Sequence, residues 1–253
     1  MFTRVKTPAE IEAMRTSGKM LAHVLKTISQ EVTEGMTGRD VVRIAERELK
    51  SLGGKGSFKG YQGFPDVICI SVNDAVVHGI PTDTPFKNGD LASFDFGVTY
   101  KGMITDSAFS MFIGGKAPSA DAERLLKATE RSMYAGIEKL KNGVRVGDIA
   151  SNIERVLKRE KLGIVRELVG HGVGHELHED PNIPNYGIAG TGQKLSAGMT
   201  IAIEPMATLG THAITVDADG WTIRTRDGGL SAHFEHTILI TDNGYEILTA
   251  WQE

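Results

Sequence analysis

Three acidic residues stand inside or beside apolar runs of the kind that form buried strands, and this feature constrains the fold most strongly. Asp95 follows Leu91-Ala92-Ser93-Phe94, Glu204 follows Ile201-Ala202-Ile203, and Glu235 precedes His236-Thr237-Ile238-Leu239-Ile240. An ionised carboxylate inside a protein is costly unless it is paired or bound to a cation. We therefore expect a fold that brings these acids together around a positive group, namely a divalent cation.

A fourth acid, Asp106, is predicted to approach Asp95 through a hairpin. The two residues are 11 positions apart, and Lys101-Gly102 between them is a turn signal. Antiparallel strands joined at this turn would bring the two carboxylates close together. A lone aspartate of this kind is usually a hydrogen-bonded residue at a strand end, but two converging aspartates favour metal binding.

His171 is the candidate nitrogen ligand of the same site. Gly170 and Gly172 flank it, which allows close backbone approach and argues against a helix. The nearby stretch His175-Glu176-Leu177-His178 does not have the spacing of the H-E-x-x-H zinc-protease motif. With His78, these histidines form a group of four in two loops that contain glycine or proline.

The candidate ligand set therefore contains four carboxylates, one imidazole and no thiolate. This is too much negative charge for one ion, so we expect two divalent ions. Oxygen-rich ligation with one nitrogen suits Co, Mn, Fe(II) or Zn. Two-metal sites hold their ions about 3.5–4 Å apart and activate a bridging water, which makes hydrolysis the expected chemistry.

The composition excludes several other classes of protein. Of the 253 residues, 40% are hydrophobic and 24% are charged, which is typical of a globular chain. The net charge of -4 argues against nucleic-acid binding, and the single cysteine, Cys69, fits a reducing compartment. The sequence shows neither a signal peptide nor an apolar run of about 20 residues. We expect a cytoplasmic protein that binds neither nucleic acid nor membranes.

The predicted elements alternate twice between helices and strands. Thr7-Pro8-Ala9-Glu10 is a helix-start signal with a capping box, and a second helix is expected near 40–52. Two more helices are predicted near 120–141 and 147–161. Strands are predicted near 67–73, 91–100, 103–113, 165–169, 199–205, 212–216, 222–226 and 232–240.

Two segments repeat at nearly the same offset. Asp40 and its neighbours match Asp148 and its neighbours 108 positions later, and Asp95 matches Glu204 at 109 positions. A constant offset is the usual signature of repeated units. We predict a single domain, residues 1–253, made of two related halves, about 8–115 and 118–250, with the site between them.

The residues identified so far resemble those of the type I methionine aminopeptidases along nearly the whole chain. The matching stretches are Asn73-Asp74-Ala75-Val76-Val77-His78-Gly79-Ile80-Pro81, Asp95 with Asp106, Gly170-His171-Gly172-Val173-Gly174, His178-Glu179-Asp180-Pro181, Ile203-Glu204-Pro205-Met206 and Phe234-Glu235-His236-Thr237. The resemblance implies the pita-bread fold, an α+β architecture with a central curved antiparallel sheet, two pseudo-symmetric halves and helices outside.

The resemblance also implies roles for the candidate residues. It makes Asp95, Asp106, His171, Glu204 and Glu235 the ligands of a dinuclear site, with Asp106 and Glu235 bridging the ions. It gives His178 a hydrogen bond to the scissile carbonyl, gives His78 contact with the peptide beyond the cleaved bond, and lets Glu204 shuttle a proton. His175 has no role in this scheme.

A methionine pocket is implied as well. Its expected walls are Tyr61, Phe64, Cys69, His78, Leu177 and Trp221, with Phe58 at the rim, and His178 would also contact the substrate. A thioether packs well against aromatic rings. Leu177 stands where an aromatic residue is common in this family.

The implied activity is methionyl aminopeptidase: removal of the initiator methionine from nascent proteins when the second residue is small, by attack of a metal-bridging water or hydroxide. The partners would be N-terminal Met peptides; ribosome association stays open, and a monomer is expected. One alternative is a prolidase or Xaa-Pro peptidase, which usually carries a large extra N-terminal domain. Another is a non-catalytic binding protein on the same fold, which would typically lack metal ligands.

Overall fold

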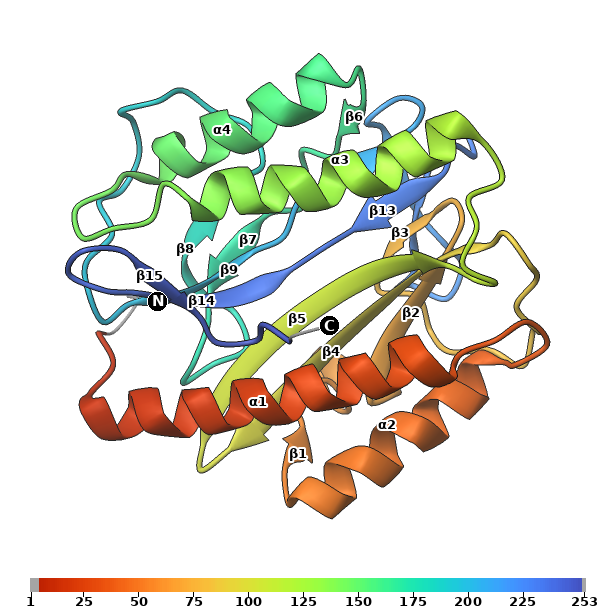
Figure 1. Cartoon of the computed structure of the whole chain (residues 1–253), viewed down its shortest axis with the longest axis horizontal. Coiled ribbons are helices and arrows are strands. Elements are labelled where there is room, and N and C mark those ends of the chain that lie inside the picture. Colours follow the sequence, from red (N-terminus) through yellow and green to blue (C-terminus); the bar gives the residue numbers. More distant parts are fainter. Residues whose placement is uncertain (1–4, 252–253) are drawn as a thin grey trace.

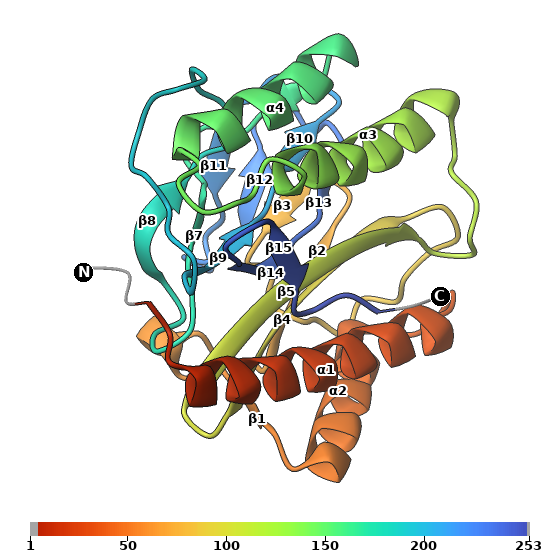
Figure 2. The same ribbon diagram turned by 60° about the vertical axis from the view of Figure 1, so that its left-hand side comes forward.

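The computed structural model describes residues 5–251 (Figure 1). Its α-helices are α1 (Pro8–Glu31), α2 (Gly38–Leu52), α3 (Ala120–Ile137) and α4 (Val146–Arg159). In Figure 1 the pair α1 and α2 lies at the bottom and the pair α3 and α4 at the top, with the strands between them. The turned view in Figure 2 keeps the same arrangement. No helix in this part of the chain is long and apolar enough to cross a membrane.

Helix α1 begins where the sequence predicted. The Thr7 side chain accepts a hydrogen bond from the backbone N–H of Glu10, and the Glu10 carboxylate accepts the N–H of Thr7, so the predicted capping box is confirmed. The apolar stripe of α1, including Met14 and Leu21, is buried. It packs against the long strands β4 (Leu91–Tyr100) and β5 (Met103–Phe112).

Strands β4 and β5 form the predicted hairpin. Tyr100 pairs with Met103, so the loop consists of Lys101 and Gly102 alone, with φ of 48° and 78°. Positive φ at both central residues defines a tight turn whose twist matches that of the flanking strands. Strands β2 (Ile68–Val72) and β1 (Lys55–Gly56) also pair with β4 in this sheet.

The second large sheet has the strand order β15-β14-β9-β7-β8. Its members are β15 (Tyr245–Ile247), β14 (His236–Ile240), β9 (Thr200–Ile203), β7 (Gly170–Gly172) and β8 (Glu179–Ile183). Two smaller sheets have the orders β13-β10-β6 and β11-β12-β3. Their strands are β13 (Ser231–His233), β10 (Met206–Thr208), β6 (Gly163–Ile164), β11 (Ile214–Val216), β12 (Ile223–Thr225) and β3 (Ala75–Val77).

Strand β5 meets the segment that leads into β14, and we call this contact the β5–β14 junction (residues 106–108 with 235–237). Ala108 and Glu235 form an isolated antiparallel bridge. The Thr237 hydroxyl accepts from the Asp106 N–H at 2.9 Å and donates to the Asp106 carbonyl at 2.8 Å. The Ser107 hydroxyl donates to the Glu235 carbonyl at 2.6 Å. The junction therefore joins the two parts of the chain at two of the candidate ligands.

Equivalent contacts recur in the two predicted halves. Thr37 bridges Pro85, and Arg145 bridges Lys194, at positions 108 and 109 residues later. Both Thr37 and Arg145 are N-cap residues, of α2 and α4. The division into two related halves stays a prediction, and these matched contacts favour it.

Two predicted strands are wrong in detail because the chain changes sheets within them. Residues 165–169 are not a strand; they connect β6, which pairs with β10, to β7, which pairs with β9. The predicted strand 232–240 is divided at Phe234 and Glu235 into β13, paired with β10, and β14, paired with β9. Glu235 thus lies at a change of sheet, outside both strands.

Candidate metal centre and adjoining pocket

All candidate site residues line one cavity of about 120 Å³. Its walls contain each predicted ligand, each predicted catalytic group and each predicted pocket residue, together with Gln62, which the sequence did not single out. The lining residues are Phe58, Tyr61, Gln62, Phe64, Cys69, His78, Asp95, Asp106, His171, Leu177, His178, Glu204, Trp221 and Glu235.

Strand register places Asp95 and Asp106 on the same side of the hairpin. Asp106 pairs with Gly97, two positions from Asp95 on β4. Side chains alternate along a strand, so residues 95 and 97 share a face and the two aspartates are diagonal neighbours. Both side chains are buried.

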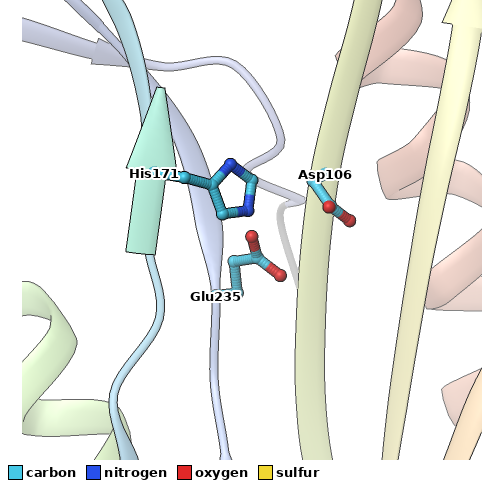
Figure 3. Close-up of side chains that lie close together, drawn as sticks. All are labelled: Asp106, His171 and Glu235. Atoms are coloured by element: carbon cyan, nitrogen blue, oxygen red, sulfur yellow. The ribbon is translucent and has the colours of Figure 1, made fainter. Parts of the chain in front are cut away.

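The remaining candidate ligands come from the other part of the chain. His171 lies on β7, Glu204 directly follows β9, and Glu235 lies between β13 and β14. Figure 3 shows the His171 ring and the Glu235 carboxylate facing Asp106 on β5. One ligand atom from each of these three buried residues lies within 4.8 Å of the others.

The hydrogen bonding of His171 leaves one ring nitrogen available for a cation. Its Nδ1 lies 2.9 Å from the carbonyl oxygen of Gly172, which can only accept, so Nδ1 carries the proton. The Nε2 atom then has a free lone pair, and it lies 3.3 Å from Glu204 Oε1. Metal-binding histidines typically donate their second nitrogen in this way. Burial also lowers the pKa of His171 to about 3, which keeps the ring neutral.

The four carboxylates are strongly perturbed by their surroundings. Burial raises the pKa of Asp95 to about 7 and that of Glu204 to about 8. Burial raises the pKa of Asp106 and of Glu235 well above the usual range, and neighbouring carboxylates raise both further. Without a cation, these acids cannot all be ionised near neutral pH.

The residues present fit a divalent cation. Among residues 5–251, Asp95 Oδ1, Asp106 Oδ1 and Glu235 Oε1 are buried and accept no hydrogen bond. No lysine or arginine in this range forms a salt bridge with any of the four carboxylates, and the imidazoles of His171 and His233 lie 3.3 Å and 3.6 Å from oxygens of Glu204. Buried polar groups are normally satisfied, so three unpartnered carboxylate oxygens in one cavity with an unprotonated imidazole nitrogen indicate a missing positive ligand. The set of oxygens and one nitrogen suits Mn, Fe, Co or Zn.

Two further histidines border the cavity. The Tyr61 hydroxyl lies 2.8 Å from His178 Nδ1, and the His178 ring packs edge-on against His171 with centroids 4.3 Å apart. His78 follows β3 with φ of 58°, and burial lowers its pKa to about 4. Burial also lowers the pKa of His178, so both rings are neutral groups that can donate or accept a hydrogen bond at the edge of the carboxylate cluster.

An apolar pocket adjoins the carboxylates. Phe58, Phe64, Cys69 and Leu177 are buried together, and Tyr61 and Trp221 pack against them. The Phe64 ring meets Trp221 edge-on with centroids 5.2 Å apart. Burial, followed by the nearby carboxylates, raises the pKa of the Cys69 thiol well above its usual value, so Cys69 serves as an apolar wall.

Sequence reasoning missed His233. Its side chain is buried, neither ring nitrogen has a hydrogen-bond partner in the described part of the chain, and Nε2 lies 3.6 Å from Glu204 Oε2. The Glu204 carboxylate therefore lies between the imidazoles of His171 and His233. His233 stands two positions before the candidate ligand Glu235 in the sequence, and side chains two positions apart in a strand share a face. This spacing is the signal by which His233 could be found.

The sequence profile of metallopeptidase family M24 matches residues 12–242. The chain belongs to this family. Methionine aminopeptidase 1 of Bacillus subtilis is 43% identical over 96% of this chain and 98% of its own length. Methionine aminopeptidase of Escherichia coli K12 is 39% identical over 98% of this chain and 94% of its own length.

Solved structures confirm the fold of this M24 metallopeptidase. A methionine aminopeptidase from Thermotoga maritima superposes with a TM-score of 0.96 at 43% identity, over 99% of this chain and 100% of its own. A prolidase from Pyrococcus furiosus superposes with a TM-score of 0.78 at 24% identity, over 98% of this chain and 66% of its own, which shows the shared fold alone. The predicted pita-bread fold is therefore confirmed.

Proposed function

We propose that this M24 metallopeptidase is a methionine aminopeptidase that removes the initiator methionine from nascent proteins when the second residue is small. The observation that carries the proposal is one cavity in which a cation-binding carboxylate cluster directly adjoins an apolar pocket of aromatic, thiol and leucine side chains. The similarity to methionine aminopeptidases of Bacillus subtilis and Escherichia coli supports it, because the match covers 96% and 98% of this chain.

Asp95, Asp106, His171, Glu204 and Glu235 would hold two divalent ions, with Asp106 and Glu235 shared between them. When bound, such ions supply Lewis-acid polarisation of a carbonyl and lower the pKa of water. The remaining contributions come from the protein. Glu204 would accept a proton from the attacking water and pass it to the leaving amine, because its carboxylate lines the cavity beside the imidazoles of His171 and His233.

We propose that His178 stabilises the oxyanion. If the Tyr61 hydroxyl donates to His178 Nδ1, then Nε2 carries the proton and can donate to the scissile carbonyl oxygen. A preorganised donor of this kind is usually among the largest contributions to catalysis. His78 contacts the peptide on the far side of the cleaved bond.

The apolar pocket selects the side chain of the first residue. Aromatic rings and the Cys69 thiol suit the long, polarizable thioether of methionine. The proposed substrate pocket consists of Tyr61, Phe64, Cys69, His78, Leu177, His178 and Trp221, with Phe58 at its rim. Leu177, which is 3% exposed, fills the position at which the family often has an aromatic ring.

The two alternatives have less support. Likeness to a prolidase is confined to the fold, and that protein is longer than this chain. A non-catalytic binding protein has no need for a buried cluster of unpartnered carboxylates. A nascent-chain substrate would place the enzyme in the cytoplasm, where we propose that it acts as a monomer on N-terminal Met peptides.

The test compares release of the first residue from Met-Ala-Ser and Ala-Pro-Ala by apo-protein with and without Mn(II), Co(II) or Fe(II). We expect metal-dependent release of methionine alone. Cleavage of the proline peptide instead would establish the prolidase alternative. No cleavage of either peptide with any metal would favour the binding protein.

A further inference from the structure

The segment ahead of α1 is tied to the turn that leads to His178. Lys6 Nζ lies 2.7 Å from Glu179 Oε2, and the two side chains are 0% and 5% exposed. The backbone N–H of Lys6 donates to the Gly198 carbonyl at 2.8 Å, which holds this segment beside the start of β9. A residue six positions into the chain therefore ends in a buried ion pair beside the candidate active site.

Glu179 links this lysine to the turn itself. Its second oxygen, Oε1, accepts the backbone N–H of His175 at 2.6 Å and that of Glu176 at 3.2 Å. One carboxylate thus joins the Lys6 ammonium to two amides of the turn 174–178. His178 lies in the sequence between these two amides and Glu179, so the bonds of Glu179 close a short loop that contains His178.

Close packing limits how far the turn can move. A Cβ atom on Gly174 would lie 2.4 Å from Lys6 Cε, so the lysine stem rests directly on this glycine. The Gly174 carbonyl accepts the N–H of Ile104 on β5 at 2.7 Å. A hydrogen bond between His175 Nε2 and Glu10 Oε1, at 2.8 Å, ties the turn to the first turn of α1.

We propose that Lys6 is a positioning residue for the cleavage reaction: through Glu179 it fixes the turn 174–178 and holds the His178 imidazole at the cavity. This inference rests on the proposed function, because it requires His178 to act on the scissile carbonyl. Removing one partner of a buried ion pair leaves an uncompensated charge, so the turn must rearrange. A displacement of about 1 Å can cost about a hundredfold in rate.

The test is a double-mutant cycle on methionine release from Met-Ala-Ser. We expect Lys6→Met to lower kcat about 10- to 100-fold in the otherwise unchanged enzyme. In the His178→Ala background the same substitution should lower kcat by less than about twofold, because the group it positions is gone. Lys6→Arg, which keeps the charge, should restore most of the rate.

Arg15→Met is the matched control, because it removes an ion pair of α1 whose two residues do not line the cavity. Arg15 pairs with Glu246 at 2.7 Å, and both side chains are partly exposed. Its kcat should equal that of the parent. Bound metal per chain and near-ultraviolet circular dichroism would show that each variant is folded and loaded.

If Lys6→Met does not fold, the double variant Lys6→Met/Glu179→Gln removes both charges and enters the same cycle. Parent-like kcat for Lys6→Met, or an equal loss with and without His178, would overturn the inference. A parent enzyme that releases no methionine would instead overturn the proposed function.

Discussion

Asp106 belongs both to the cavity and to the β5–β14 junction, so its side chain can be tested separately from its backbone. Asp106→Asn keeps the backbone bonds to Thr237 and removes one negative charge from the cluster. We expect kcat/KM to fall on the order of a thousandfold, because a proposed metal ligand loses its charge. Steady-state kinetics and bound metal per chain measure the effect.

The same substitution at Asp227, an exposed turn residue that accepts the backbone N–H of Thr211, is the control and should leave activity unchanged. A folded Asp106→Asn protein with full activity and full metal content would contradict the assignment of Asp106 as a ligand.

His178 and Tyr61 should act in sequence. His178→Ala removes the proposed donor and should lower kcat about a hundredfold. Tyr61→Phe removes the 2.8 Å contact to Nδ1 that fixes which nitrogen of His178 carries the proton, and a smaller loss, about tenfold, is expected. Stopped-time peptide assays give both values, and a larger loss for Tyr61→Phe than for His178→Ala would argue against this order.

His233 offers a test that the sequence did not suggest. Its unpartnered Nε2 near Glu204 motivates the hypothesis that an N–H donor there orients the Glu204 carboxylate. His233→Leu should lower kcat about tenfold, as expected when a polar contact at 3.6 Å with the Glu204 carboxylate is removed. His233→Gln, which retains an N–H donor, should stay near the parent rate. Equal rates for the two variants would show that the donor is irrelevant.

The acids were predictable and His233 was not, for a physical reason. A carboxylate inside an apolar run is unusual in any sequence, because it is costly to bury, so Asp95, Glu204 and Glu235 could be noticed one by one. A histidine in a strand is common in proteins. Only its distance from Glu204 and its lack of partners distinguish His233, and both depend on chain segments that meet in three dimensions.

At the scale of elements, the two-residue turn between β4 and β5 sets the relative position of Asp95 and Asp106. Gly102 has φ of 78°, and within residues 5–251 no atom beyond its two chain neighbours would lie within 4 Å of an alanine Cβ, so Gly102→Ala meets backbone strain without a steric clash. We expect the free energy of unfolding to fall by about 1 kcal/mol, measured by urea denaturation.

Lys101→Asn serves as the comparison at the same turn. Lys101 also has positive φ, at 48°, and asparagine tolerates this conformation better than lysine. The variant should be at least as stable as the parent. A stabilising effect of Gly102→Ala would contradict the turn geometry.

Local sequence signals predicted those elements well whose structure depends only on residues close together in the sequence. The capping box of α1 and the hairpin turn require only neighbouring residues, and both are confirmed. The strand predicted at 165–169 is wrong, and that at 232–240 is divided, because the chain there exchanges one sheet partner for another. The periodicity of apolar residues predicts that a segment is a strand, but it does not predict which other strand pairs with it.

At the scale of the whole molecule, metal binding should be coupled to stability and to pH. In the metal-free protein, burial raises the pKa of Asp95 to about 7 and of Glu204 to about 8, above the value of about 4 expected when unfolded. The stability that these protonated acids contribute is complete below about pH 4 and is lost as the pH rises through 7 to 8.

A divalent ion needs the ionised acids, so the rise in Tm between EDTA and Mn(II) should be larger at pH 8 than at pH 5.5. Differential scanning calorimetry at both pH values measures it. An equal gain in Tm at both pH values would contradict the coupling.

The β5–β14 junction has a consequence for how the protein unfolds. Thr237 holds the backbone of Asp106, and Ala108 holds that of Glu235. Some of the bonds that join the two parts of the chain therefore lie at the same residues that supply the two carboxylates proposed to be shared by the ions. Separation of the parts would divide the ligand set at once. Denaturation should therefore be a single cooperative transition in which tertiary structure, bound ions and catalysis disappear together.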